Sequence, residues 1–320
     1  MKIREIANKI KEFDTIGITC HVSPDGDAMG SSLALYEAIK TLGKKVYIIS
    51  KESIPNDFKF LKNSVEVSED KENVLEGIQC VIVVDCGNKE RINGNLNFEN
   101  RNYKIINIDH HVSNENYGDY NYVDSKSAAT CEIIYSVIKE LGVTLNKDIA
   151  TCIYTGLLTD TGSFRHSTTS KYTHEVAGYL IETGIDFSEI HRTLFDRKSM
   201  GKIKLYGKAI DTIELSCDNK FCTMYITRDM LEELNLLDED TSDVITFGNK
   251  IESVEVVALI KEREDGGVKV SLRSKRCVDV NKIAGVFNGG GHVRASGFAS
   301  AMDIKNVKFI LNEILCKELI

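Results

Sequence analysis

Short apolar runs alternate with amphipathic segments along the first half of the chain. The apolar runs are rich in β-branched residues and predict buried strands, whereas apolar residues at helical spacing predict helices between and after them. The predicted strands are residues 15–20, 45–50, 80–84 and 104–108. The predicted helices are residues 31–42, 128–141, 147–158 and 172–183. This alternation predicts an α/β fold with a doubly wound, mostly parallel sheet over residues 1–185.

The pattern changes in the second half of the chain. Residues 186–215 predict continuous helix without an intervening strand, and we expect this helical linker to join two domains. The elements predicted after it are strands at 221–226, 254–261 and 268–273, a hairpin turn at 265–267, and helices at 280–287 and 304–319. Residues 216–320 therefore predict a second, smaller α/β domain, and the glycine-rich loop described below makes it the expected substrate-binding domain.

Composition places the chain among ordinary globular proteins. It has 320 residues, of which 28% are charged and 42% hydrophobic, enough for two domains. The net charge of −8 argues against broad binding of long nucleic acid. Because no apolar run could span a bilayer and the first residues lack a signal-peptide core, we expect a cytoplasmic protein without a membrane partner. Nine cysteines without a CxxC pair do not predict a disulfide framework.

Acidic and histidine residues follow the predicted strands and helices in four clusters. They are His21, Asp25 and Asp27; Asp85; Asp109, His110 and His111; and Asp160. Ligands of open α/β sheets bind outside the carboxyl ends of the strands, where these clusters fall. Carboxylates with a few imidazoles suit a hard or borderline divalent ion such as Mn²⁺, and the absence of thiolates argues against a structural zinc site. The sequence therefore predicts a metal centre that holds two ions.

Each cluster also has a structural interpretation. Asp85 and Asp160 taken singly could cap a helix or turn. The adjacent imidazoles of His110 and His111 are harder to place at the edge of a core without partners. One could ligate a metal while the other meets a phosphate, and Asp109 could orient a ring.

A glycine-rich loop near the end of the chain is the second candidate site. Gly289, Gly290 and Gly291 precede His292 and Arg294, and Arg273 lies on a predicted strand nearby. The alternative is a flexible turn between helix and strand. Glycine amides and arginines together suit a terminal phosphate or an end nucleotide, so we expect these residues to bind substrate. Arg165 and His166 follow Asp160 and either line the same cleft or lie in a solvated loop.

The four acidic clusters resemble, in order and spacing, the four motifs of the DHH phosphoesterase family. The tail with Arg273, the three glycines and His292 resembles the DHH-associated domain of its smaller members. The resemblance implies two Mn²⁺ ions and a catalytic pair. It implies that His21, Asp25 and Asp85 hold one ion, that Asp27, Asp85, His110 and Asp160 hold the other, and that His111 faces the scissile phosphate with Asp109 behind it.

The function implied is a hydrolase that uses metal-activated water, and no Ser/His/Asp or Cys/His arrangement competes with it. The resemblance implies oligoribonuclease action on short RNA and linear dinucleotides, and phosphatase action on 3′-phosphoadenosine 5′-phosphate (pAp). Two alternatives stay open: a stand-alone cyclic-dinucleotide phosphodiesterase, and a non-catalytic nucleotide-binding sensor. The expected partners are short RNA or nucleotides and no long duplex, and a homodimer is left open.

Overall fold

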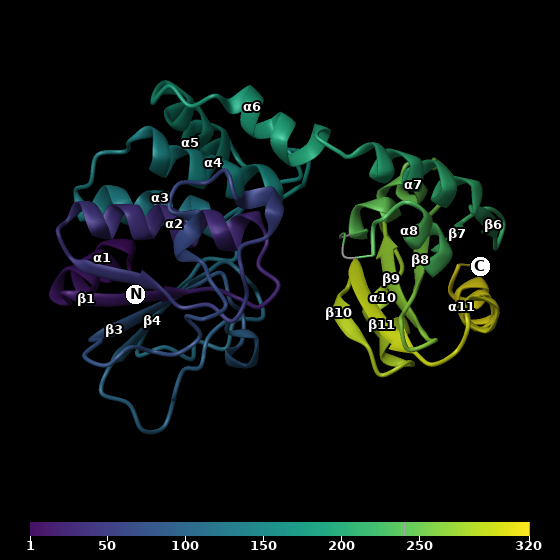
Figure 1. Ribbon diagram of the computed structural model, residues 1–320, viewed down its shortest axis with the longest axis horizontal. Coiled ribbons are helices and arrows are strands. Elements are labelled where there is room, and N and C mark those ends of the chain that lie inside the picture. The colour runs from purple at the N-terminus through teal and green to yellow at the C-terminus, as the bar shows by residue number, and fades with distance from the viewer. Residues whose placement is uncertain (238, 240, 320) are drawn as a thin grey trace. The chain divides into compact units, whose positions relative to one another are not determined.

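The computed structural model describes residues 1–237, 239 and 241–319. The chain forms two compact units, Met1–Arg197 and Lys198–Ile320, called here the first and second units. Figure 1 shows the elements of each.

The first unit is built on a five-stranded sheet in which every pairing is parallel, in the order β2-β1-β3-β4-β5. Its strands are β1 (Thr15–Thr19), β2 (Lys45–Ile48), β3 (Cys80–Val84), β4 (Lys104–Asp109) and β5 (Tyr120–Val123). Its helices are α1 (Ile3–Glu12), α2 (Gly26–Thr41), α3 (Thr130–Leu141), α4 (Lys147–Asp160), α5 (Lys171–Glu182) and α6 (Phe187–His191). The strand order reverses between β1 and β3, which marks the switch point where such sheets bind ligands.

The two faces of this sheet are covered differently. Ile16, Ile18 and Ile82 on one face pack with α1–α4 into the main core. On the other face, Val81 and Val83 pack against residues of the irregular connections, such as Ile78, Ile92 and Tyr103. The continuous apolar runs of β3 and β4 follow from this, because a strand covered on both sides has no solvent face.

The α/β fold and the mostly parallel sheet predicted from the sequence are confirmed. The main shift is at α2, which begins at Gly26, five residues before the predicted start at 31. Asp25 caps this helix, since its Oδ1 accepts hydrogen bonds from Asp27 N and Ala28 N. The metal-ligand candidates Asp25 and Asp27 therefore belong to a helix start and not to the loop that the sequence suggested.

The second unit contains a six-stranded sheet in the order β10-β11-β9-β8-β7-β6, antiparallel except for the β7–β8 pair. Its strands are β6 (Glu214–Ser216), β7 (Phe221–Ile226), β8 (Val256–Glu262), β9 (Val268–Ser274), β10 (Gly290–His292) and β11 (Ala295–Ser300). Its helices are α7 (Met200–Asp211), α8 (Arg228–Glu233), α9 (Ile245–Asn249), α10 (Val280–Gly285) and α11 (Ile304–Glu318). Helices α10 and α11 cover one face, and α7–α9 cover the opposite face over β7 and β8.

The continuous helix predicted over 186–215 is wrong. After α6 the chain forms a π-helical turn at Arg192–Asp196 and becomes extended at Arg197. Ser199 then starts a new helix, α7, by accepting a hydrogen bond from Lys202 N, and the last residues of the range enter β6. The charged, amphipathic pattern of residues 186–211 does not reveal the break between α6 and α7, because charged and apolar residues alternate similarly in both helices.

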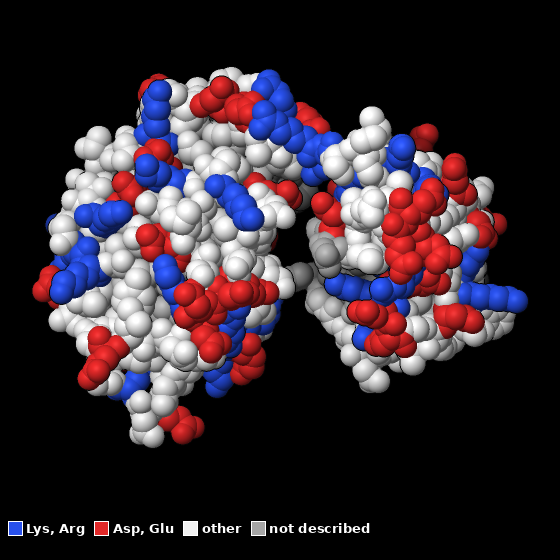
Figure 2. Space-filling model, in the orientation of Figure 1, with Lys and Arg blue, Asp and Glu red and all other residues white. Residues whose placement is uncertain are grey.

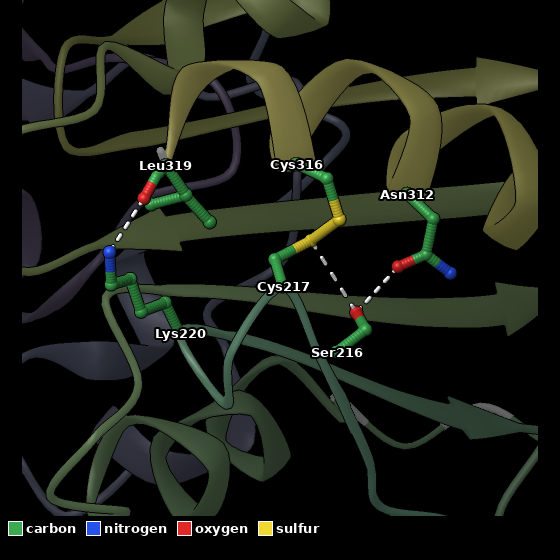
Figure 3. The surroundings of a disulfide bond; sticks show 6 residues. All are labelled: Ser216, Cys217, Lys220, Asn312, Cys316 and Leu319. Carbon is green, nitrogen blue, oxygen red and sulfur yellow. Dashed lines mark hydrogen bonds between the residues drawn. A yellow bond between two sulfur atoms is a disulfide. The ribbon is translucent and has the colours of Figure 1, made fainter.

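A disulfide joins Cys217 to Cys316, which the sequence analysis did not expect. Figure 3 shows it fastening α11 to the turn between β6 and β7, beside hydrogen bonds from Ser216 Oγ to Asn312 Oδ1 (2.5 Å) and from Lys220 Nζ to Leu319 O (2.7 Å). Five cysteines that lie in apolar stretches of the sequence are free and buried; they are Cys20, Cys80, Cys131, Cys152 and Cys222. The bond therefore closes a long loop within the second unit, a connection that typically stabilises a fold by about 2–4 kcal/mol.

The surface carries both signs of charge. On the face of each unit visible in Figure 2, Lys and Arg are interspersed with Asp and Glu. This mixture of charges accords with the modest net charge of −8. Among the described helices, none combines the length and the apolar composition needed to cross a bilayer.

Candidate metal centre

The acidic and histidine clusters converge at the carboxyl end of the parallel sheet. His21 lies just beyond β1, Asp85 follows β3 directly, and Asp109 closes β4. Asp27 comes from the first turn of α2, and Asp160 ends α4. Parallel strands bring their carboxyl ends to one edge, so segments far apart in the sequence meet there.

Asp85 lies at the middle of the cluster and is only 2% exposed. Its Oδ2 is 3.6 Å from His21 Nε2, and its Oδ1 is 3.7 Å from His110 Nε2. The two carboxylate oxygens thus face different histidines.

Two further groups of ligand atoms complete the cluster. His21 Nε2 lies 3.8 Å from Asp25 Oδ2, which with Asp85 makes one set of three. His110 Nε2 lies 3.3 Å from Asp160 Oδ2 and 4.0 Å from Asp27 Oδ2, a second set. Each set could hold a cation, since its ligand atoms all lie within 4.8 Å of one another.

Both candidate histidine ligands are held through the opposite ring nitrogen. His21 Nδ1 lies 2.8 Å from the Val22 carbonyl, and His110 Nδ1 lies 3.2 Å from the Ser127 carbonyl. An Nδ1–H that donates to a backbone carbonyl directs Nε2 and its lone pair toward the carboxylates. Metal-binding histidines are usually fixed in this way.

The start of α3 holds two of the carboxylates. Thr130 N donates to Asp27 Oδ2 at 2.6 Å, and Cys131 N donates to Asp27 Oδ1 at 2.8 Å. Thr130 Oγ1 donates to Asp85 Oδ1 at 3.0 Å. A helix start offers unpaired amides and a positive dipole end, so it favours carboxylates in the charged form.

Helices α2 and α4 cross with almost no space between them, which brings Asp27 and Asp160 to the same cluster. A Cβ on Gly30 of α2 would lie 2.4 Å from Cys152 O and 3.2 Å from Gly156 N, both backbone atoms of α4. Only glycine allows backbones to approach this closely.

Asp109 and His111 form a hydrogen-bonded pair, and His111 also belongs to a third group of possible ligand atoms with Asp85 and His110. His111 Nδ1 donates to Asp109 Oδ1 at 2.7 Å, and Asn114 Nδ2 donates to Asp109 Oδ2 at 2.5 Å. Asn107, buried in β4, in turn donates to Asn114 Oδ1 at 2.8 Å. Asp109 is therefore fixed from both sides and holds the ring of His111.

The electrostatics of the cluster indicate an excess of carboxylate charge. Burial and the neighbouring Asp85 raise the pKa of Asp27, and burial and the neighbouring Asp27 raise the pKa of Asp160. Burial alone would lower the pKa of His110, but the surrounding carboxylates outweigh it and raise that pKa. A site that disfavours its own anions in this way is suited to cations, and its oxygen and imidazole donors fit a divalent ion.

The backbone at Asp85 adds a constraint. Its φ of 53° lies in the left-handed region, which aspartate and asparagine tolerate better than most residues. Strain of this kind persists where surrounding structure holds the residue in place, and here Thr130 Oγ1 does so.

Arg165 and His166 lie in the loop after Asp160. His166 Nδ1 lies 3.1 Å from the Asp160 carbonyl, and Arg165 Nε donates to the Gly162 carbonyl at 2.6 Å. Both side chains are exposed. They are thus close in sequence and in space to one candidate ligand.

The candidate residues of the tail lie together in the second unit. Strand pairing sets Arg273 opposite Ala295, and Ala295 opposite His292. Arg273 Nη1 donates to the Leu272 carbonyl, and Arg294 Nη1 donates to the Val278 carbonyl. His292 and Arg294 are exposed, and Arg273 is partly buried.

Two of the three glycines lie in a strand, and Gly289 comes directly before it. Gly290 and Gly291 belong to β10. A Cβ on Gly289 would meet the Gly297 carbonyl at 2.3 Å, and one on Gly291 would meet the Ala295 carbonyl at 2.6 Å. Their small size is therefore needed for the close approach of β11.

Sequence analysis missed the residues that hold the cluster by hydrogen bonds. Thr130 and Asn114 are ordinary polar residues in the sequence, and Ser127 acts through its carbonyl. The only local signal was the position of Thr130 at a predicted helix start, which does not reveal what its amide contacts.

Comparison with known proteins gives a match to each unit. The DHH family, N-terminal domain, matches residues 15–157, and the DHHA1 domain matches residues 218–315. The bifunctional oligoribonuclease and PAP phosphatase NrnA of Thermus thermophilus is 35% identical over 297 residues, covering 92% of this chain and 87% of that protein. The protein of the same name from Bacillus subtilis is 34% identical over 324 residues, covering 98% of each chain. The crystal structure of an exopolyphosphatase-related protein from Bacteroides fragilis has a TM-score of 0.92 at 25% identity, covering 99% of this chain and 96% of that one.

Proposed function

Because the chain belongs to the DHH phosphoesterase family of hydrolases, we propose that it is a manganese-dependent enzyme that cleaves short oligoribonucleotides and dephosphorylates pAp. The observation that carries this proposal is that relatives named as bifunctional oligoribonuclease and PAP phosphatase align with at least 92% of the chain. The cluster of carboxylates and imidazoles supplies donors suited to the chemistry.

We assign His21, Asp25 and Asp85 to one Mn²⁺ ion. Asp27, Asp85, His110 and Asp160 are assigned to the second. Two such ions supply Lewis-acid activation of water and positive charge that stabilises phosphoryl transfer. The two oxygens of Asp85, which face His21 and His110, support its assignment as the shared ligand.

His111 and Asp109 are assigned to the scissile phosphate. The hydrogen bond from His111 Nδ1 to Asp109 raises the pKa of His111 and so favours its protonated ring. A protonated imidazole can bind a phosphate oxygen as both cation and donor. Asp109 keeps that ring in one orientation, since Asn114 holds its other oxygen.

The second unit is assigned to nucleotide binding through Arg273, His292 and Arg294, with Gly289, Gly290 and Gly291 shaping the strand. Residues directly opposite one another in a sheet share a face, so Arg273 and His292 flank the small side chain of Ala295. Burial lowers the pKa of Arg273 and also strengthens its attraction for an anion. Arg165 and His166 are assigned to substrate binding in the first unit.

Turnover across a substrate panel tests the proposal. At a fixed Mn²⁺ concentration we expect hydrolysis of a diribonucleotide and release of phosphate from pAp, and much slower cleavage of a twenty-residue RNA. The reason is that a few arginines can hold a terminal phosphate but not a long backbone on a chain of net charge −8. Equal rates on short and long RNA, or preferential hydrolysis of cyclic dinucleotides, would contradict it.

Replacement of Arg273 by glutamine is expected to raise KM for a diribonucleotide about tenfold to a hundredfold, the range for a lost hydrogen bond to a charged group. The kcat for an aryl phosphodiester without a nucleotide should stay unchanged, since Arg273 lies outside the metal cluster. Arg276→Gln is the matched control, because Arg276 is an exposed arginine just beyond the same strand. An unchanged KM for Arg273→Gln would remove this residue from the site.

A further inference from the structure

A buried carboxylate outside the metal cluster is connected to it by hydrogen bonds. Glu132, in the first turn of α3, is only 5% exposed. In the described part of the chain, the two hydrogen-bond partners of its carboxylate are both hydroxyls, and neither is a lysine or an arginine. An acid placed in a core in this way is costly unless its oxygens are satisfied, so its presence calls for a reason.

Each oxygen of Glu132 accepts one hydroxyl. Ser127 Oγ lies 3.0 Å from Glu132 Oε1, and Thr173 Oγ1, from the start of α5, lies 2.6 Å from Glu132 Oε2. Ser127 sits in the loop that joins β5 to α3. Glu132 therefore fastens this loop to α3 and α5 together.

The loop so fastened carries the carbonyl that orients His110. His110 Nδ1 lies 3.2 Å from Ser127 O, and on the other side of the ring Nε2 faces Asp27, Asp85 and Asp160. Three residues after Ser127, the backbone of Thr130 donates to Asp27 and its hydroxyl to Asp85. A displaced loop would therefore disturb an imidazole and two carboxylates together.

We propose that Glu132 is a positioning residue for the second metal site: through Ser127 it sets the ring of His110, and through the start of α3 it sets Asp27 and Asp85. The proposal rests on the function proposed above, because it presumes that these residues hold a metal ion. Glu132 touches neither metal nor substrate in this role. Its effect reaches the site through the Ser127 carbonyl and the helix start.

Glutamine is the sharpest replacement at this position. It keeps the shape of Glu132 but removes the negative charge and replaces one acceptor oxygen with an amide donor, so one of the two hydroxyls must reverse its hydrogen bond. Ser136→Ala is the matched control, since Ser136 is on the same helix, its hydroxyl lies 2.8 Å from Tyr172 Oη, and it contacts Glu132 only at the backbone carbonyl (3.3 Å), not at the carboxylate. The control removes a polar contact of α3 without touching the loop before it.

The experiment measures Mn²⁺ binding by competition with a chelator, together with kcat and KM for a diribonucleotide. Partners that orient a metal-binding histidine typically contribute tenfold to a hundredfold in metal affinity, so Glu132→Gln should weaken one ion about tenfold or more. The loss of kcat should be recovered at high Mn²⁺ with KM unchanged, which a merely destabilised fold would not show. Ser136→Ala should bind both ions like the unmodified protein.

Wild-type affinity for both ions in Glu132→Gln would overturn the inference. If that variant does not fold, Ser127→Ala decides in its place, since it removes the hydroxyl bound to Glu132 and leaves the carbonyl present. Weakened binding there supports the inference, and unchanged binding overturns it. Failure of the proposed function is distinguishable, because the unmodified protein would then bind no Mn²⁺ or hydrolyse no phosphoester.

Discussion

Replacing Asp85 with asparagine is expected to lower kcat/KM for a diribonucleotide by about 10³-fold, because a bound metal supplies several kcal/mol of transition-state stabilisation. The same variant should lose metal from both halves of the cluster, since the two oxygens of Asp85 face His21 and His110. Asparagine is preferable to alanine here because it tolerates the φ of 53° at this position. Metal content is measured by elemental analysis after dialysis.

The control for this variant is Asp119→Asn. Asp119 is a partly buried aspartate that pairs with Arg101 and accepts a hydrogen bond from Ile105 N near the start of β4, away from the carboxyl end where the cluster lies. Its loss should reduce stability but not metal content. If Asp85→Asn retained two Mn²⁺ ions and normal turnover, the assignment of a shared ligand would be wrong.

Removing metal is expected to abolish hydrolysis, and Mn²⁺ is expected to restore it. Co²⁺ should support activity, whereas Ca²⁺ should do so poorly, because Ca²⁺ prefers six to eight oxygen ligands in a loose shell. The measurement is turnover after exhaustive chelation followed by addition of each ion. Undiminished turnover of the chelated protein would exclude the proposed metal-dependent mechanism.

Stability gives an independent readout of the same change. Without cations, burial and neighbouring carboxylates raise the pKa of Asp27 and Asp160, so the folded cluster carries unfavourable charge. A ligand present at a hundred times its Kd stabilises a fold by about 2.7 kcal/mol, so saturating Mn²⁺ should raise Tm by roughly 5–10 °C. An inert salt at matched ionic strength is the control.

Local pattern was sufficient for most of the framework. The apolar run Cys80–Val84 was predicted with its observed bounds, because a strand buried on both faces is apolar at every position. Asp85, Asp109 and His110 could be recognised as candidates since polar residues at strand ends are placed by the strands themselves. The disposition of these groups at one edge then follows from the parallel sheet.

The sequence alone determined the α/β class, four of the five strands of the first unit (β5 was not predicted) and the order of the acidic clusters, because periodicity and strand ends are local properties of the chain. Tertiary structure decided the contacts between residues that are far apart in the sequence. It decided that the amides of Thr130 and Cys131 hold Asp27 over a separation of more than one hundred residues. It also decided that the Ser127 hydroxyl donates to Glu132, and that Cys217 meets Cys316. Such contacts depend on where folded elements meet in space. The residues around one partner in the sequence do not indicate which distant residue it will contact.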